Sequence, residues 1–203
     1  MLIRLNEKCP NNPMIISRLG RFCLEIGKKV EAISLFSVIE DMLERQNRSA
    51  QSASEAASPT AHLDNLLGSN ETKSADNNEL AIVNLLNQGF LKIFEAQYEE
   101  AIKYFRQVQT FRPGNIVAAN NLATCKIFLN KVGESIKTLE DLVKKDPLNN
   151  INEQVVQNIV SMYDIQFAQN PNDKKSLLAD FCSKHSKDSV NAAVYVQHAQ
   201  VKA

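Results

Sequence analysis

The residues that could hold a metal ion or perform thiol chemistry are few and scattered along the chain. They are His62, His185 and His198, together with Cys9, Cys23, Cys125 and Cys182. No two of them have the spacing of a zinc-binding or redox motif such as HExxH or CxxC. We therefore expect no metal site, and we expect the cysteines to be reduced thiols that pack in helices as small apolar residues.

Motifs that cradle a phosphate or activate a nucleophile are also missing from the sequence. It contains no GxxxxGK[ST], GxGxxG or GxSxG pattern. Carboxylate pairs such as Glu99–Glu100 and Glu140–Asp141 lie in segments rich in lysine, which is typical of solvated helix faces with i,i+4 ion pairs. The sequence predicts that the protein is not an enzyme and uses no cofactor.

The charge and the apolar content of the sequence limit the kinds of molecule that the protein could bind. The 203 residues suit one domain, or one domain with a flexible segment, and 23 basic residues balance 23 acidic ones. A neutral chain has no electrostatic footprint for nucleic acid or for an anionic membrane. No apolar stretch approaches ~20 residues, and the first residues lack the pattern of a secretory signal. We expect a cytoplasmic protein that neither binds nucleic acid nor inserts directly into a membrane.

Helical periodicity occupies two parts of the chain. Apolar residues recur at helical spacing over 14–46, with a break at Gly27-Lys28-Lys29, and again over 80–183. In the second part and beyond it, the spacing predicts helices at 80–95, 98–111, 115–129, 132–145, 151–168, 173–183 and 188–200. The segment 47–79 differs, because Ser, Ala and Asn make up about half of it. It is predicted to be a flexible insert without a helical face, or to dock one helical turn at 62–67.

A sequence repeat links these helices. Pro113 and Pro147 stand 34 positions apart, which is the spacing of the tetratricopeptide repeat, a helix–turn–helix unit. Small residues at repeat positions 8 and 20 should let two antiparallel helices approach closely, beside a large residue at position 24. The repeat-defining residues are Gly20, Ala32 and Phe36 in 13–46, Gly89, Ala101, Phe105 and Pro113 in 82–115, and Ala123 and Pro147 in 116–149.

These repeats predict an all-α fold, a right-handed solenoid of tetratricopeptide helix pairs with C-terminal capping helices. The expected organisation is a first helix pair at 1–46, the flexible insert at 47–79, two repeats at 80–149 and capping helices at 150–203. The second unit starts one position later than two repeat lengths after the first. Either a degenerate unit was lost there, or the length of the insert is coincidental, as its lack of a helical face favours.

Such a stack would present one concave face to a partner. The residues expected to line it are mostly apolar with a few amides, which suits a partner helix or an extended peptide. The candidate binding residues are Asn87, Phe90, Phe94, Asn121 and Phe128. The alternative is that the three phenylalanines pack against neighbouring helices and the site lies elsewhere.

A groove for a carboxylate tail is disfavoured. Chaperone-binding tetratricopeptide domains clamp a C-terminal carboxylate with converging lysine, arginine and asparagine side chains. The equivalent positions here are Ser17, Arg21, Asn87, Val117 and Asn121, of which only Asn87 agrees. The cations that this clamp requires are absent from these positions.

A more particular resemblance rests on three stretches. They read AANNLATC at 118–125, LEDLV at 139–143 followed by Asp146-Pro147, and EQVVQNIVSMYD at 153–164. With the repeats, they resemble the C-terminal repeat region of the trafficking protein particle (TRAPP) complex subunit 12 family, over roughly 14–46 and 80–183. In that family a long region precedes the repeats, and the insert here is longer than expected.

The resemblance implies a non-catalytic scaffold subunit of a vesicle-tethering complex. Such a complex acts in endoplasmic-reticulum-to-Golgi transport and autophagy, peripheral to the Golgi. Its partners would be the other subunits and, indirectly, a Rab-type GTPase, whose nucleotide exchange other subunits promote. The second hypothesis is a generic tetratricopeptide adaptor that binds a peptide or partner helix in its groove.

Overall fold

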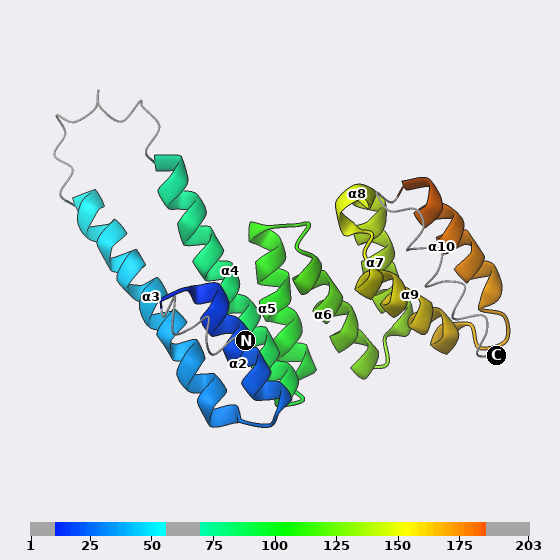
Figure 1. Cartoon of the computed structure of the whole chain (residues 1–203), viewed down its shortest axis with the longest axis horizontal. Helices are drawn as coiled ribbons and strands as arrows, with labels where there is room; N and C mark the ends of the chain where they lie inside the picture. The colour runs from blue at the N-terminus through cyan, green and yellow to red at the C-terminus, as the bar shows by residue number, and fades with distance from the viewer. Residues whose placement is uncertain (1–10, 56–69, 186–203) are drawn as a thin grey trace. The chain divides into compact units, whose positions relative to one another are not determined.

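The computed structural model describes residues 11–55 and 70–185, and every regular element within these two ranges is a helix. The chain forms two compact units that divide between Gln97 and Tyr98. Figure 1 labels the helices of both units. The first unit contains α2 (Pro13–Glu25), α3 (Lys29–Glu55) and α4 (Asn70–Phe94). The second contains α5 (Tyr98–Phe111), α6 (Ile116–Phe128), α7 (Val132–Lys145), α8 (Pro147–Asn150), α9 (Glu153–Gln166) and α10 (Asn172–His185).

Three helices begin at an asparagine whose side chain caps free backbone amides. Asn12 Oδ1 accepts from the amides of Met14 and Ile15 at the start of α2, where Pro13 occupies the first helical position. Asn115 caps α6 and Asn152 caps α9 in the same way, each accepting from the amide three residues later. These bonds satisfy donors that a helix start otherwise leaves unpaired.

One type of turn recurs between helices. Gly27, Ala96 and Asn130 each have a positive φ, of 79°, 56° and 58°, and each lies two residues beyond the end of α2, α4 or α6. After each, the next amide returns to a carbonyl five residues earlier, as in the 2.7 Å bond from Lys28 N to Cys23 O. This is the Schellman closure of a helix C-terminus. Ala96 and Asn130 have the same separation as Pro113 and Pro147, so the turn follows the period of the sequence repeat.

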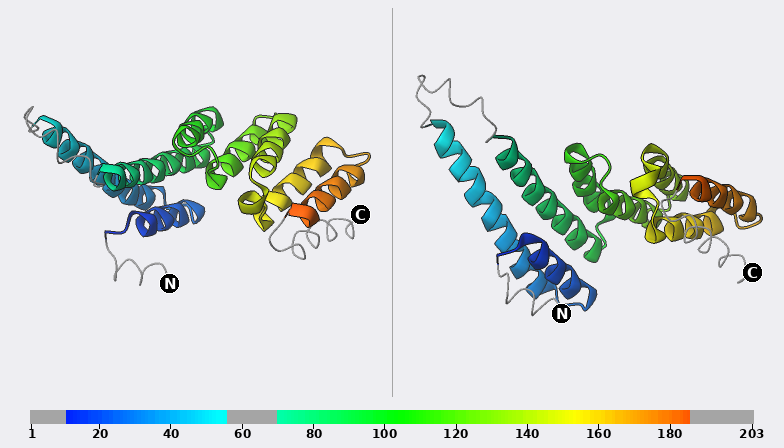
Figure 2. Two further views of the ribbon diagram at one scale, coloured as in Figure 1. Left: turned by 90° about the horizontal axis from the view of Figure 1, so that it is seen from above. Right: turned by 45° about the horizontal axis from the view of Figure 1, so that its top comes forward.

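In the first unit α2 packs against both α3 and α4, which also contact each other (Figure 2). Gly20 on α2 lies against the ring of Phe36 on α3, and a Cβ at Gly20 would overlap that ring. Ala32 and Ile39 on α3 are fully buried beside it. The absence of a side chain at Gly20 therefore sets how closely α2 and α3 approach.

In the second unit α6 packs against α5 and α7, and α7 also packs against α9. Ser135 on α7 is fully buried and its Oγ donates to the carbonyl of Ala123 on α6 at 2.6 Å. Small side chains at both positions allow this approach of backbone to side chain. The core continues through Leu139 on α7 and Ile159 and Met162 on α9, so α9 packs against the α6–α7 pair.

The predicted insert at 47–79 requires correction at both ends. Helix α3 runs on to Glu55, and α4 begins at Asn70. Extending an existing helix adds one hydrogen bond per ordered residue without a new nucleation cost, and alanine and glutamate favour the helix. An i,i+4 ion pair between Glu44 and Arg48 supports the extension of α3. The predicted docking turn at 62–67 lies outside the described residues.

Most other predicted helix boundaries agree with the structure within two residues. This includes the helix predicted at 151–168, which the structure has as α9 at Glu153–Gln166, but the short helix α8 before it was not predicted. Pro147 occupies the first position of α8, where its missing amide costs no helical hydrogen bond. The predicted helix at 188–200 lies outside the described residues.

Candidate protein-binding surfaces

An open apolar pocket lies between α2 and α4 in the first unit. It has a volume of about 380 Å³, and we call it the Arg21 pocket. Its walls are Arg21, Leu24, Glu25, Phe90, Ile93 and Phe94. The side chain of Phe94 is 42% exposed, so this apolar pocket is open to solvent. Two of the phenylalanines expected in a binding groove therefore line one pocket.

Arg21 is the charged group of this pocket. Its guanidinium carbon lies 5.1 Å from the centre of the Phe90 ring, and its Nε donates to the carbonyl of Ser17 at 3.4 Å. Burial and the nearby charge of Arg18 lower the pKa of Arg21, and Glu25 partly opposes them. Within residues 11–55 and 70–185, Arg21 forms no ion pair with a carboxylate.

Asn87 also lies where α2 and α4 pack against each other, but its side chain has no exposed surface. Its Oδ1 accepts a hydrogen bond of 2.6 Å from Ser17 Oγ, and its Nδ2 has no partner among the described residues. Asn84 lies one turn earlier, and its buried Oδ1 accepts no hydrogen bond from a described residue. Asn87 thus joins two helices, and its amide is not open to a ligand in this structure.

The other two candidate groove residues lie on α6, in the second unit. Asn121 Nδ2 donates to the carbonyl of Val117 on its own helix at 2.8 Å. Phe128 is 60% exposed and stacks on Tyr98 with ring centres 4.6 Å apart and planes within 4° of parallel. One face of the Phe128 ring therefore stacks on Tyr98, a residue that was not among the candidate binding residues.

The repeat-defining residues between Gly89 and Pro147 occupy buried or terminal positions. Ala101 and Phe105 on α5 are fully buried, and Gly89 on α4 is also buried. Pro113 follows the end of α5, and Pro147 begins α8. Whether Gly89 faces Ala101 remains a prediction, because these residues belong to different units.

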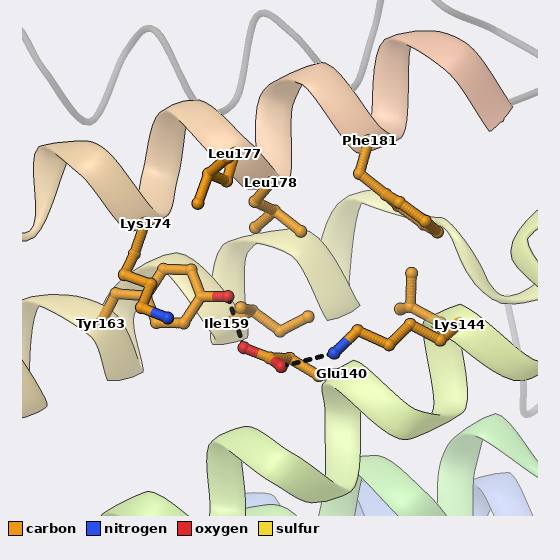
Figure 3. A pocket seen from close by; sticks show the side chains of 9 residues that line it. Glu140, Lys144, Ile159, Tyr163, Lys174, Leu177, Leu178 and Phe181 are labelled. Carbon is orange, nitrogen blue, oxygen red and sulfur yellow. Dashed lines mark hydrogen bonds and ion pairs between the residues drawn. The ribbon is translucent and has the colours of Figure 1, made fainter.

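A second pocket of about 220 Å³ lies between α7, α9 and α10 in the second unit. In Figure 3, Glu140 of α7 faces Tyr163 of α9, while Leu178 and Phe181 project from α10 above them. Glu140 accepts from Tyr163 Oη at 2.7 Å and from Lys144 Nζ at 2.8 Å. We call this site the Tyr163 pocket.

Electrostatics in the Tyr163 pocket favour a charged Glu140 and a neutral Tyr163. Burial and the bond to Glu140 raise the pKa of Tyr163 well above its ordinary value. Burial opposes the ionised form of Glu140, but the hydrogen bonds from Lys144 and Tyr163 still lower its pKa. The sequence indicated the i,i+4 pair with Lys144 but carried no signal for the contact with Tyr163, which comes from another helix.

Residues 11–55 and 70–185 contain neither a cluster of metal ligands nor a helix that could span a membrane. No group of three or more His, Cys, Asp or Glu side chains there could hold a metal ion. None of the helices in these ranges combines the length and apolar character that crossing a bilayer requires. The thiols of Cys125 and Cys182 are fully buried, and burial raises the pKa of each to about 11.

Comparison with known proteins agrees with the helix pairs. A family profile described as tetratricopeptide repeat matches residues 95–152. Trafficking protein particle complex subunit 12 of Mus musculus is 30% identical over 179 residues, which is 88% of this chain. The Homo sapiens protein of the same name is 28% identical over the same length. The chain spans about one fifth of the length of these curated relatives, 19% and 20% respectively. The chain thus has an all-α tetratricopeptide-repeat fold and is similar, over most of its length, to part of subunit 12 of the trafficking protein particle complex.

Proposed function

We propose that this chain is a non-catalytic scaffold subunit of a TRAPP-type vesicle-tethering complex. The observation that carries the proposal is the similarity of 88% of the chain to a protein named as a subunit of that complex. Stacked helix pairs with exposed apolar side chains suit such a role, because repeat folds commonly bind partners along their surfaces. Fold alone does not specify the partner.

The same resemblance supports the finer parts of this proposal. The chain would bind other subunits, contact a Rab-type GTPase only indirectly, and act in endoplasmic-reticulum-to-Golgi transport and autophagy. It would work in the cytoplasm, peripheral to the Golgi. Its contribution would be binding energy, with a few buried side chains dominating the interface.

The Arg21 pocket is the best-supported contact surface in this proposal. Phe94 is 42% exposed beside Ile93, so a partner that covers the pocket would remove apolar area from water. Burying that area stabilises the complex by about 25 cal/mol per Å². Phe128, which is 60% exposed, is a second anchor that a partner could cover. The amides Asn87 and Asn121 are weaker candidates, because both already bond within the chain.

The test is co-purification of the tagged full chain from cells, with size-exclusion chromatography and mass spectrometry. The wild type should migrate in a large assembly with other TRAPP subunits. Replacing Phe90, Phe94 and Phe128 with serine should release it while helical circular dichroism persists. Since Phe90 also packs against the core, the single variant Phe94→Ser is tested alongside and should weaken the association.

A matched control replaces exposed apolar residues outside the Arg21 pocket. Phe22→Ser and Phe111→Ser change side chains that are 47% and 49% exposed, and the complex should remain intact. A folded triple variant that still co-purifies would contradict the role of these rings. A wild-type chain that migrates as a monomer would favour the adaptor hypothesis, in which the same substitutions abolish peptide binding without changing assembly size.

A further inference from the structure

The Arg21 pocket has two distinct parts, and together they indicate what occupies it. The apolar part consists of Leu24, Phe90, Ile93 and Phe94, and its volume of about 380 Å³ lies within the ~300–1,000 Å³ of ligand pockets. A pocket of this character accepts a large apolar side chain, such as leucine or phenylalanine. It does not by itself distinguish one apolar segment from another.

The polar part is the guanidinium of Arg21. Five N–H donors surround this group, and in the described ranges the chain supplies a single acceptor, the carbonyl of Ser17 at 3.4 Å. The other interaction is with the face of Phe90, which orients the planar group at the pocket wall. A half-buried cation with unused donors binds a carboxylate well, because two parallel N–H···O bonds form in a fixed geometry.

Neighbouring charges favour a ligand with one negative charge over a ligand with two. Glu25 lines the same pocket and lies close enough to act on the charge of Arg21 without forming an ion pair with it. A dianionic group such as a phosphate would be repelled by Glu25 and would have one half-buried cation to bind. Arg18 contributes positive charge nearby, and because both Arg18 and Glu25 are exposed, solvent screens the charge of each.

We propose that the Arg21 pocket binds a protein segment in which an aspartate or glutamate stands close to a large apolar residue. The apolar side chain enters between Leu24 and Phe94, and the carboxylate pairs with Arg21. This inference rests on the proposed function in that the occupant is a protein segment, but it also holds for the adaptor hypothesis. It names the chemistry of the partner rather than its identity.

The test is a synthetic peptide array probed with the purified, labelled full chain. Each peptide carries Leu, Phe or Ala, with Glu, Gln or Lys placed one to four positions away. Peptides with Leu or Phe and Glu should be retained about tenfold more strongly than those with Gln, given the strength of charged hydrogen bonds. Peptides with Lys should be retained least.

Variants of the chain assign this preference to Arg21. Arg21→Gln should abolish the preference for Glu over Gln but retain the preference for Leu and Phe over Ala. Arg21→Lys keeps the charge but loses the fork, so its preference should be intermediate. Arg18→Gln is the matched control, and its preference should equal that of the wild type. Thermal unfolding of each variant checks that it remains folded.

Three results would overturn the inference. They are equal retention of Glu and Gln peptides, an unchanged preference in Arg21→Gln, and retention of no peptide at all. Failure of the proposed function is distinguishable, because a chain that prefers acidic peptides but never co-migrates with TRAPP subunits fails only the first proposal. A chain that co-migrates through Phe94 and shows no acidic preference fails only the second.

Discussion

At the residue scale, buried polar groups carry the specificity of the helix contacts. Ser17 and Asn87 are far apart in sequence and form a buried bond of 2.6 Å between α2 and α4. Glu140 and Tyr163 connect α7 to α9 through a bond that is partly buried. Each bond fixes the register of one helix against another, because a buried polar group left unpaired is costly.

The bond between Ser17 and Asn87 can be measured with a double-mutant cycle. Ser17→Ala should lower the free energy of unfolding by about 1–3 kcal/mol, because the buried Asn87 amide then lacks its remaining partner. Asn87→Leu alone leaves Ser17 without its acceptor, whereas the double variant removes both polar groups. The coupling from urea unfolding should be about 0.5–3 kcal/mol. Strictly additive effects would contradict a direct bond.

The Tyr163 pocket predicts a pH dependence of stability. Because folding raises the pKa of Tyr163 above its ordinary value of 10.0, its contribution is complete below pH 10 and is lost as the pH rises above it. Glu140 has a lowered pKa, so its contribution is present above its ordinary value of 4.5 and is lost on acidification. Urea unfolding monitored by circular dichroism from pH 4 to 10.5 measures both effects.

Tyr163→Phe isolates the tyrosine from the two buried thiols, which also titrate at high pH. The variant should be less stable at pH 7 by about 1.5–3 kcal/mol, the cost of a hydrogen bond to a charged group. The gap between wild type and variant should narrow above pH 10, where only the wild type loses the tyrosine contribution. A gap independent of pH would show that the bond to Glu140 does not form.

At the element scale, the recurring positive-φ turns make the helix pairs possible. Gly27 adopts this conformation without strain, whereas Ala96 and Asn130 carry a Cβ that disfavours it. Asparagine tolerates the left-handed region better than alanine does. The turn after α4 is therefore the most strained of the three.

Exchanging alanine and glycine tests this account of the turns. Ala96→Gly should raise the free energy of unfolding by about 1 kcal/mol, because it relieves the left-handed Cβ. Gly27→Ala should lower it by a similar amount, although no atom would clash with the new Cβ. Gly114→Ala is the control, since Gly114 has open space and no positive φ, and its effect should be small. Destabilisation by Ala96→Gly would refute strain at this turn.

At the scale of the whole molecule, contacts concentrate within two units that divide between Gln97 and Tyr98. The first unit has two apolar clusters, one around Ile39 and one around Phe36, and the second unit has a core around Leu139 and Ile159. In repeat proteins, stability is close to a sum of local terms. A change in one core should therefore be felt chiefly in its own unit.

Hydrogen exchange of the full chain tests this local response. Gly20→Ala would place a Cβ against the Phe36 ring and should destabilise the first unit by about 1–3 kcal/mol. Exchange should accelerate in α2 and α3 and stay nearly unchanged in α7 and α9. Gly133→Ala is the matched control, because its Cβ meets no atom within 4 Å and alanine favours the helix. Equal acceleration in both units would contradict local stability.

The sequence by itself determined the features that depend on neighbouring residues. Helical periodicity and the prolines at 113 and 147 indicated most helices, because the causes of these signals lie within a few residues. The extension of α3 to Glu55 was missed, since composition alone does not register the advantage of continuing an existing helix. The same applies to α4, which starts at Asn70.

Only the tertiary structure decided which side chains are open and which are used within the fold. It buried Asn87 against Ser17, oriented Arg21 over Phe90 and joined Tyr163 to Glu140. Each of these contacts joins residues of different helices, so its distance depends on how the helices pack rather than on local sequence. Periodicity shows which residues share a helix face, and packing determines what that face meets.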